Sequence, residues 1–93
     1  MEPLTDSEID ERLARIDPAW RREGEELVRD LELEDFAQAV ARVNAIAAAA
    51  ERADHHPDLL IHSYRRLRIT LSTHSAGGLT DSDFELARTI DAL

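Results

Sequence analysis

The chain has 93 residues, of which 43% are hydrophobic, and this length suits one compact domain over residues 1–93. Twenty acidic residues against eleven basic ones give a formal net charge of -9, which disfavours direct binding to nucleic acid or to an anionic membrane surface. The absence of cysteine excludes disulfides, thiolate metal sites and cysteine nucleophiles.

The first residues lack the basic start and apolar run of a signal peptide, and no apolar stretch approaches the length of a transmembrane helix. We therefore expect a cytoplasmic protein. A chain this small buries only a modest fraction of its own surface, so we also expect a homodimer or homotetramer in which subunits share buried surface.

The first third of the chain predicts a short helix followed by two strands. Thr5 and Glu8 have the spacing of a capping box, which opens a helix with one apolar stripe. Asp17-Pro18 should end this helix near Ile16, because the residue before proline is pushed out of the helical region. Period-two alternation then develops within residues 20–33 and predicts two strands joined near Gly24.

The longest predicted helix runs to about Ala53. Asp35 is placed to cap its first turn, and Gln38 completes a second capping arrangement. Apolar side chains recur at helical spacing at Phe36, Val40, Val43, Ile46, Ala47 and Ala50. We expect this stripe to pack into the core.

Two further strands and a last helix complete the chain. Residues 59–64 predict a weak strand, and residues 67–73 alternate cleanly before Ala76-Gly77-Gly78 breaks the pattern. Residues 80–83 open a helix whose inward stripe is Leu86, Ala87, Ile90 and Leu93. The order α-β-β-α-β-β-α predicts an α+β fold, a four-stranded antiparallel sheet with three helices packed on one face.

Three of the four histidines lie where predicted elements end. His55 and His56 follow the long helix, and His74 follows the clearest strand. Element ends present side chains to ligands, and the ordinary histidine pKa of about 6.5 makes this side chain both an acid and a base near neutrality. The pattern indicates proton transfer. The alternative is a solvated helix end, where cations favour the negative pole of the helix dipole.

Other chemistry is less well supported. The two adjacent histidines and the distant third lack the i, i+4 spacing of HExxH zinc sites, and no GxGxxG, P-loop or GxSxG motif occurs. The residues therefore give a metal site little support. Asp83 lies on the inward stripe of the last helix, where its carboxylate could orient a ligand or a histidine, or could simply cap the positive helix end.

Several of these residues form one spaced pattern. Glu51-x-x-x-His55-His56-Pro57, then Tyr64, His74 and Asp83, resembles the signature of the pterin-4a-carbinolamine dehydratases, also known as dimerisation cofactors of a homeodomain transcription factor. The stretches 69–74 and 78–80 are also similar to that family, so the likeness covers nearly the whole chain. The sequence departs from many relatives at Leu59, where they have an aromatic residue.

The resemblance implies removal of water from 4a-hydroxytetrahydrobiopterin, or a related 4a-hydroxytetrahydropterin, after an aromatic amino acid hydroxylase has made it. The product would be the quinonoid dihydropterin, formed without metal or cofactor. By resemblance, His55 and His74 would carry protons and His56 would hold the substrate, whereas His62 has no place in the pattern. The implied pterin-binding positions are Asp54, Pro57, Ser72, Thr73, Ser75 and Asp83.

Two alternatives remain open at the level of sequence. Proteins of this kind can be non-catalytic binding modules, either in transcription-factor dimerisation or in carboxylase assembly. Assembly relatives tend to lose the histidine pattern, which is intact here and so favours an enzyme. The second alternative, a structural oligomer with incidental histidines, predicts no pterin binding.

Overall fold

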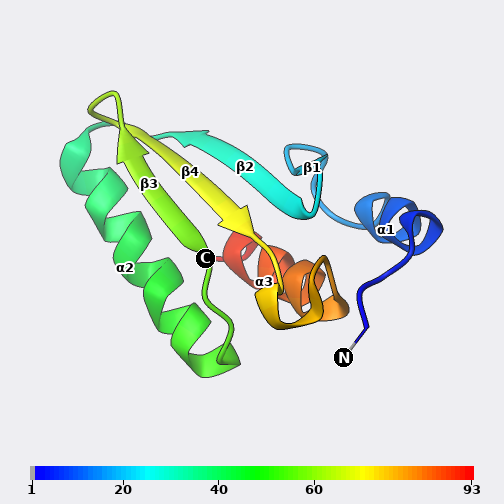
Figure 1. Ribbon diagram of the computed structural model, residues 1–93. Coiled ribbons are helices and arrows are strands. Elements are labelled where there is room, and N and C mark those ends of the chain that lie inside the picture. The colour runs from blue at the N-terminus through cyan, green and yellow to red at the C-terminus, as the bar shows by residue number, and fades with distance from the viewer. Residues whose placement is uncertain (1) are drawn as a thin grey trace.

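A computed structural model describes residues 2–93, and its elements follow the predicted order α-β-β-α-β-β-α (Figure 1). The elements are α1 (Asp6–Leu13), β1 (Arg21–Glu23), β2 (Glu26–Glu32), α2 (Phe36–Ala53), β3 (Asp58–His62), β4 (Arg66–Leu71), a short 3-10 helix η1 (His74–Ala76) and α3 (Asp81–Asp91). The predicted α+β class is confirmed. The first helix ends at Leu13, about one turn before the expected boundary near Ile16.

The four strands form one antiparallel sheet in the order β1-β2-β4-β3. β2 pairs with β4 from Leu27 opposite Leu71 to Glu32 opposite Arg66, and β3 pairs with β4 along its whole length. β4 is therefore central, and β3 leaves one of its backbone edges unpaired within the sheet. Because side chains alternate along a strand, Leu67, Ile69 and Leu71 all point to one face, and all three are fully buried.

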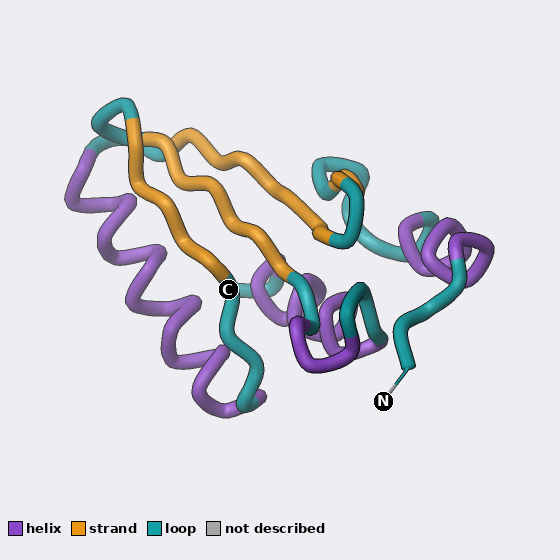
Figure 2. Tube along the Cα trace, in the orientation of Figure 1, coloured by secondary structure: helices purple, strands orange, loops and turns teal. Residues whose placement is uncertain are grey.

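The helices close that buried face. Figures 1 and 2 show α2 and α3 on the same side of the sheet, with α1 beyond β1, at the end of the sheet farthest from α2. The core combines residues from all three helices and from β2 and β4: Ile9, Leu27, Ile46, Leu67, Ile69, Leu71, Phe84, Leu86, Ala87 and Ile90. No helix of residues 2–93 has both the length and the apolar character needed to span a membrane.

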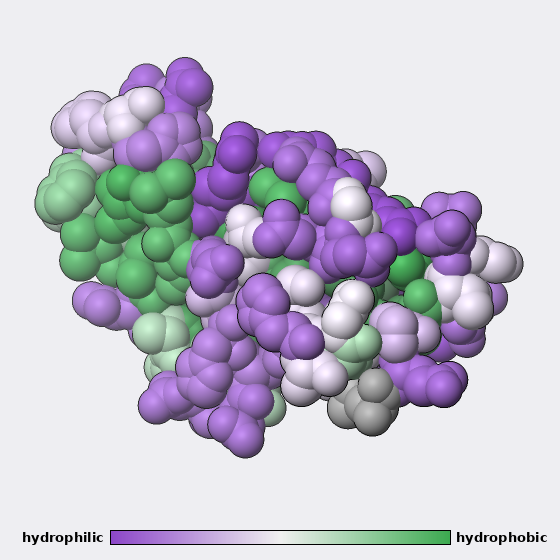
Figure 3. Space-filling view, in the orientation of Figure 1, coloured by the Kyte–Doolittle hydropathy of each residue, from purple (hydrophilic) through white to green (hydrophobic). Residues whose placement is uncertain are grey.

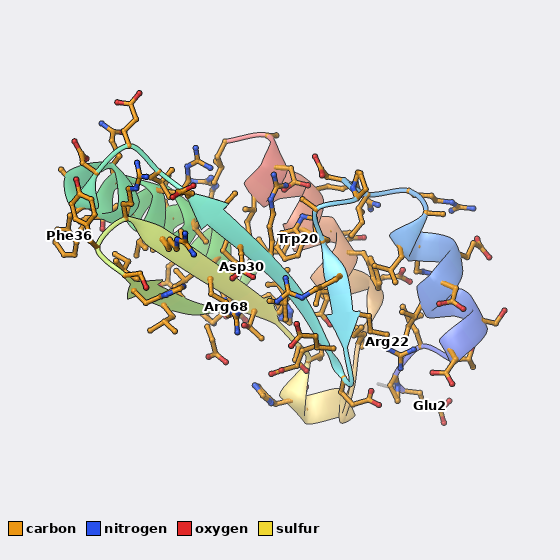
Figure 4. All side chains as sticks on the ribbon, turned by 90° about the horizontal axis from the view of Figure 1, so that it is seen from above. Glu2, Trp20, Arg22, Asp30, Phe36 and Arg68 are labelled. Atoms are coloured by element: carbon orange, nitrogen blue, oxygen red, sulfur yellow. The ribbon has the colours of Figure 1, made fainter. Side chains whose placement is uncertain are left out.

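The last turn of α3 is tied to the strands by Asp91. The indole Nε1 of Trp20 donates to both Asp91 oxygens at 3.0 Å, and Arg29 on β2 donates to Oδ1 at 2.6 Å. Trp20 is buried, and Figure 4 shows it between the strands and α3. A buried indole N–H requires an acceptor, so this contact holds both the tryptophan and the end of the helix in place.

The expected apolar stripe of α2 is only partly in the core. Ile46 and Ala50 are buried as predicted, but Phe36 is 54% exposed and Val40 is 37% exposed. Ala47 is also exposed, and the buried face instead includes Ala39 and Ala49. Alanine and valine make α2 apolar on more than the one side that the sheet can cover. Leu93, expected on the inward stripe of the last helix, is also exposed.

The uncovered apolar side chains gather at one side of the molecule. Figure 3 shows a hydrophobic patch over α2 and the neighbouring strand β3, and Figure 4 shows Phe36 projecting from that end. We call Phe36 and Val40, the two exposed apolar side chains of α2 beside the β3 edge of the sheet, the α2–β3 patch, whereas Leu60, opposite Arg68, lies on the other face of the sheet. Exposed apolar surface on one helix face is typical of a protein contact.

The position of the core gives a stability prediction. Leu67 on β4 is fully buried, so Leu67→Ala should lower the free energy of unfolding by about 2–5 kcal/mol, through lost burial and the cavity that remains. Leu60→Ala, an identical change at an exposed position of the same hairpin, should change it by no more than about 0.5 kcal/mol. Urea unfolding at one fixed protein concentration measures both values, and equal losses would contradict this assignment of the core.

Candidate active site

The turn after α2 sets the position of His55. Asp54 ends the helix in the left-handed conformation, with φ 50° and ψ 42°. Its N–H donates to the Glu51 carbonyl at 3.3 Å, and the N–H of His55 donates to the Ala50 carbonyl at 3.1 Å. This pair of bonds is a Schellman motif, with aspartate where glycine is most common. The backbone of His55 is therefore bonded to the last turn of α2.

The side chain of His55 meets a buried carboxylate. Its Nε2 lies 2.6 Å from Oδ1 of Asp83, which is on the first turn of α3 and is 0% exposed. The other carboxylate oxygen, Oδ2, accepts from the Thr73 hydroxyl at 2.8 Å and from the Thr80 backbone N–H at 3.0 Å. Asp83 thus joins the end of α2, the end of β4 and the start of α3.

Thr73 and Asp83 reach each other because both continue inward-facing patterns. Thr73 follows Leu67, Ile69 and Leu71 in the two-residue alternation, and Asp83 lies one turn before Leu86 and Ala87 on the buried stripe of α3. The Thr73 hydroxyl is also 2.8 Å from that of Thr80, which sequence analysis did not select. The only local signal for Thr80 is its position three residues before Asp83, as in a capping box.

His56 and His74 are more open than His55. His56 Nε2 lies 2.5 Å from Glu51 Oε2, and both of these side chains are largely exposed. His74 is exposed at the start of η1, directly after Thr73. A bridge between Thr73 and Gly78 closes this loop, and Gly77 ends η1 at φ 74°, a conformation that suits glycine. The loop therefore presents His74 beside the chain segment that supports His55.

Most of the other predicted site residues lie near these histidines, and Tyr64 does not. Asp54 and Ser75 are exposed, Pro57 is half-buried, and Ser72 donates its hydroxyl to the Glu25 carbonyl at 2.9 Å. Tyr64 lies in the β3–β4 turn at φ 72°, away from the histidines at the other end of β3 (Figure 1). The arrangement thus combines a carboxylate-held histidine with two exposed ones, which is suited to moving protons.

Within residues 2–93, no three side chains of histidine, aspartate or glutamate converge as metal ligands would. The carboxylate of Asp83 instead accepts hydrogen bonds from His55, Thr73 and Thr80. These side chains form a hydrogen-bonded network around one acceptor, which is the usual way to satisfy a buried charge.

A separate hollow lies on the exposed face of the sheet. Its volume is about 340 Å³, and Asp30, Leu31, Glu32, His62, Arg66 and Arg68 line it. Asp30 accepts from Arg68 Nε at 2.8 Å and from Arg21 at 3.0 Å, and Figure 4 shows Asp30 and Arg68 adjacent on neighbouring strands. These paired surface charges have no contact with the histidine site, so we do not assign the chemistry to this hollow.

The whole described chain is similar to proteins of one known family. A family model described as Pterin 4 alpha carbinolamine dehydratase matches residues 2–93. The chain belongs to the pterin-4-alpha-carbinolamine dehydratase family. A protein of Acidobacterium capsulatum that bears this family's name provisionally is 50% identical over 93 residues, which cover 100% of this chain and 99% of the relative. A Nocardia farcinica protein with the same provisional name is 50% identical over 92 residues, 99% of this chain and 95% of the relative.

Solved structures extend the comparison within the family. The crystal structure of a transcriptional coactivator/pterin dehydratase from Brucella melitensis is 35% identical, with a TM-score of 0.88 over 98% of this chain and 97% of the other. A pterin dehydratase-like protein identified as a RuBisCO assembly factor in the alpha-carboxysome is 26% identical, with a TM-score of 0.65 over 80% and 87% of the two chains. The family therefore includes proteins described by binding roles as well as by dehydration.

The ion pair beside the hollow gives a pH prediction. Hydrogen bonding from the Arg68 guanidinium, with a smaller contribution from Arg21, lowers the pKa of Asp30 below its ordinary 3.8. A lowered folded-state pKa stabilises the fold above the unfolded-state value, and this contribution is lost as the pH falls through the folded-state value. The difference in unfolding free energy between the wild type and Asp30→Asn should therefore be constant above about pH 5 and shrink below pH 3.8.

Chemical denaturation between about pH 2 and about pH 7, a range that spans the titration of carboxylates, would measure this difference. Asp58→Asn is the matched control, since Asp58 is exposed on the same sheet face and belongs to none of the ion pairs of residues 2–93. A wild-type advantage over Asp30→Asn that persists undiminished in acid would contradict the assigned shift.

Proposed function

We propose that this protein is a 4a-hydroxytetrahydropterin dehydratase that converts 4a-hydroxytetrahydrobiopterin, or a close relative, to the quinonoid dihydropterin. One observation supports it most strongly: the Nε2 of His55 is held 2.6 Å from the buried carboxylate of Asp83, in a chain that keeps all three family histidines. A carboxylate beside one ring nitrogen orients a histidine as an acid–base catalyst requires. The family match supports a pterin as the substrate class.

The proposed chemistry needs one acid and one base. A proton delivered to the C4a hydroxyl lets it leave as water, and removal of the neighbouring N5 proton leaves the electron pair that forms the new double bond. His55 and His74 are the proposed proton carriers, and His56 holds the substrate. General acid–base catalysis of this kind typically contributes about 10²- to 10⁴-fold, and the mechanism needs neither metal nor organic cofactor.

The remaining positions divide by accessibility. Asp54, Pro57, Ser72 and Ser75 are exposed or half-buried and are proposed to line the pterin site. Thr73 and Asp83 were also expected to bind the pterin, but both are buried and bonded to each other. We therefore propose that Asp83 positions His55, and that Thr73 acts through Asp83, without either touching the substrate.

Assembly and location complete the proposal. The α2–β3 patch and the unpaired edge of β3 favour a homodimer or homotetramer, because an exposed strand edge and an apolar helix face are both suited to contact with a second copy. We place the enzyme in the cytoplasm with an aromatic amino acid hydroxylase as the source of substrate. The net charge of -9 argues against a direct nucleic-acid partner.

The catalytic proposal predicts that the wild type accelerates formation of quinonoid dihydropterin from freshly generated 4a-hydroxytetrahydropterin, followed by its absorbance. His55→Ala and His74→Ala should each reduce this acceleration about 100-fold or more, because each removes a proton carrier. His62→Ala is the matched control: within residues 2–93 the His62 ring hydrogen-bonds only to the adjacent Ser63 hydroxyl, and its loss should leave the rate unchanged.

Circular dichroism would establish that each variant is folded. If a folded wild type fails to accelerate the reaction with several pterin side chains, the dehydratase proposal is wrong. In that event, a role like that of the RuBisCO assembly factor becomes the leading explanation, since it is described for a protein of the same fold.

The mass of the protein in solution tests the proposed homo-oligomer. Val40→Glu places a charge in the α2–β3 patch and should shift the protein to a lighter species in analytical ultracentrifugation, because burying an unpaired carboxylate is strongly unfavourable. Gln38→Glu adds the same charge at an exposed polar position on the same helix and should leave the mass unchanged. A wild type that sediments as a monomer at all concentrations would exclude the oligomer.

A further inference from the structure

We infer that Thr73 and Thr80 are positioning residues that form a one-directional hydrogen-bond chain through Asp83 and fix which nitrogen of His55 is the base. The inference deepens the proposed function and rests on it for its catalytic meaning. Its physical content, the placement of protons among four named side chains, can be measured without turnover.

The chain begins at the buried carboxylate. Asp83 is fully buried, and its Oδ2 receives two donors, the Thr73 hydroxyl at 2.8 Å and the Thr80 backbone N–H at 3.0 Å. An ionised carboxylate has no hydrogen to give and can only accept hydrogen bonds. The remaining oxygen, Oδ1, is the one that faces His55 Nε2 at 2.6 Å.

The direction of every proton then follows. A threonine hydroxyl has a single hydrogen, and that of Thr73 is committed to Asp83, because the carboxylate has none to give. The 2.8 Å contact between the Thr73 and Thr80 hydroxyls must therefore have Thr80 as donor. All the hydrogens point toward Asp83, so the order of donation is Thr80 to Thr73 to Asp83.

The same logic assigns the tautomer of His55. Oδ1 of Asp83 can only accept, so Nε2 of His55 carries the hydrogen. In the neutral ring Nδ1 then holds the free lone pair. Among residues 2–93, the only buried side-chain nitrogen or oxygen that lacks a hydrogen-bond partner is Nε of Arg29. Nδ1 of His55 also lacks a partner and is not such a buried atom, so it is accessible to solvent. Nδ1 is thus the atom that accepts the substrate proton.

His56 shows what the buried chain adds. Its Nε2 also meets a carboxylate, that of Glu51, but both side chains are exposed and no hydroxyl supports the carboxylate. Exposed pairs of this kind contribute little and exchange readily with water. The two adjacent histidines therefore differ in how firmly their ring protons are held: His55 has one defined tautomer, and His56 does not.

Nuclear magnetic resonance of ¹⁵N-labelled protein tests the assignment at a pH about two units above the ordinary histidine value. We expect His55 to show a protonated Nε2 with a slowly exchanging proton and an unprotonated Nδ1, whereas the His56 ring proton exchanges too fast to detect. Thr73→Val should cause loss of the His55 proton signal, and Thr73→Ser should retain it. Thr80→Val, one bond farther away, should have a smaller effect in the same direction.

Kinetics supply a second readout. Thr73→Val should lower kcat about 10- to 100-fold, by analogy with the loss seen when a partner that orients a metal-ligating histidine is removed, with KM nearly unchanged. Thr73→Ser should restore kcat. Thr70→Val, the same change on β4 but on the opposite sheet face, is the matched control. A rise in KM with kcat unchanged would mean that Thr73 contacts the pterin instead.

The outcomes separate the two proposals. A His55 ring protonated at Nδ1 in the wild type, or a Thr73→Val protein with an unchanged His55 proton signal, would overturn the hydrogen-bond chain. A wild type that shows the expected signals and no dehydration would support the chain and overturn the proposed function. Thr80→Val and Thr73→Ser keep the test decisive should Thr73→Val fail to fold.

Discussion

The carboxylate of Asp83 accepts hydrogen bonds from three segments that are far apart in the sequence: the residues after α2, the end of β4 and the start of α3. Twenty-eight residues separate Asp83 from His55 along the chain, and ten separate it from Thr73. An isolated ionised group in the interior is very unfavourable. The Asp83 carboxylate therefore has all its hydrogen bonds only when the three segments are packed together. The same condition assembles the candidate site.

Asp83 contributes both to the hydrogen bonding of the fold and to the candidate site. Asp83 lies on the first turn of α3, where the positive end of the helix dipole favours a negative charge, and its Oδ2 accepts from the backbone of Thr80. Its other oxygen is left for His55. Removing the carboxylate would therefore affect the start of α3 as well as the histidine, which is why variants of the threonines and of His55 separate the two roles better.

Much of the fold could be predicted from local patterns. Thr5 with Glu8 forms the expected capping box, and Asp35 caps α2 through the Gln38 N–H, because these bonds span three residues and leave a spacing in the sequence. The exposure of Phe36 and Val40 could not be predicted in the same way. Periodicity identifies an apolar helix face but not what covers it. The pairing of His55 with Asp83 likewise depends on tertiary structure, and the catalytic roles remain predictions.

The Schellman turn at Asp54 has a mechanical consequence. Because the N–H of His55 is bonded to the Ala50 carbonyl, the backbone of this histidine is fixed to the last turn of α2. α2 has 18 residues and is about 27 Å long, with Phe36 at its first turn and His55 just beyond its last. The helix therefore joins the exposed apolar side chain of Phe36 to the histidine that meets the buried carboxylate of Asp83.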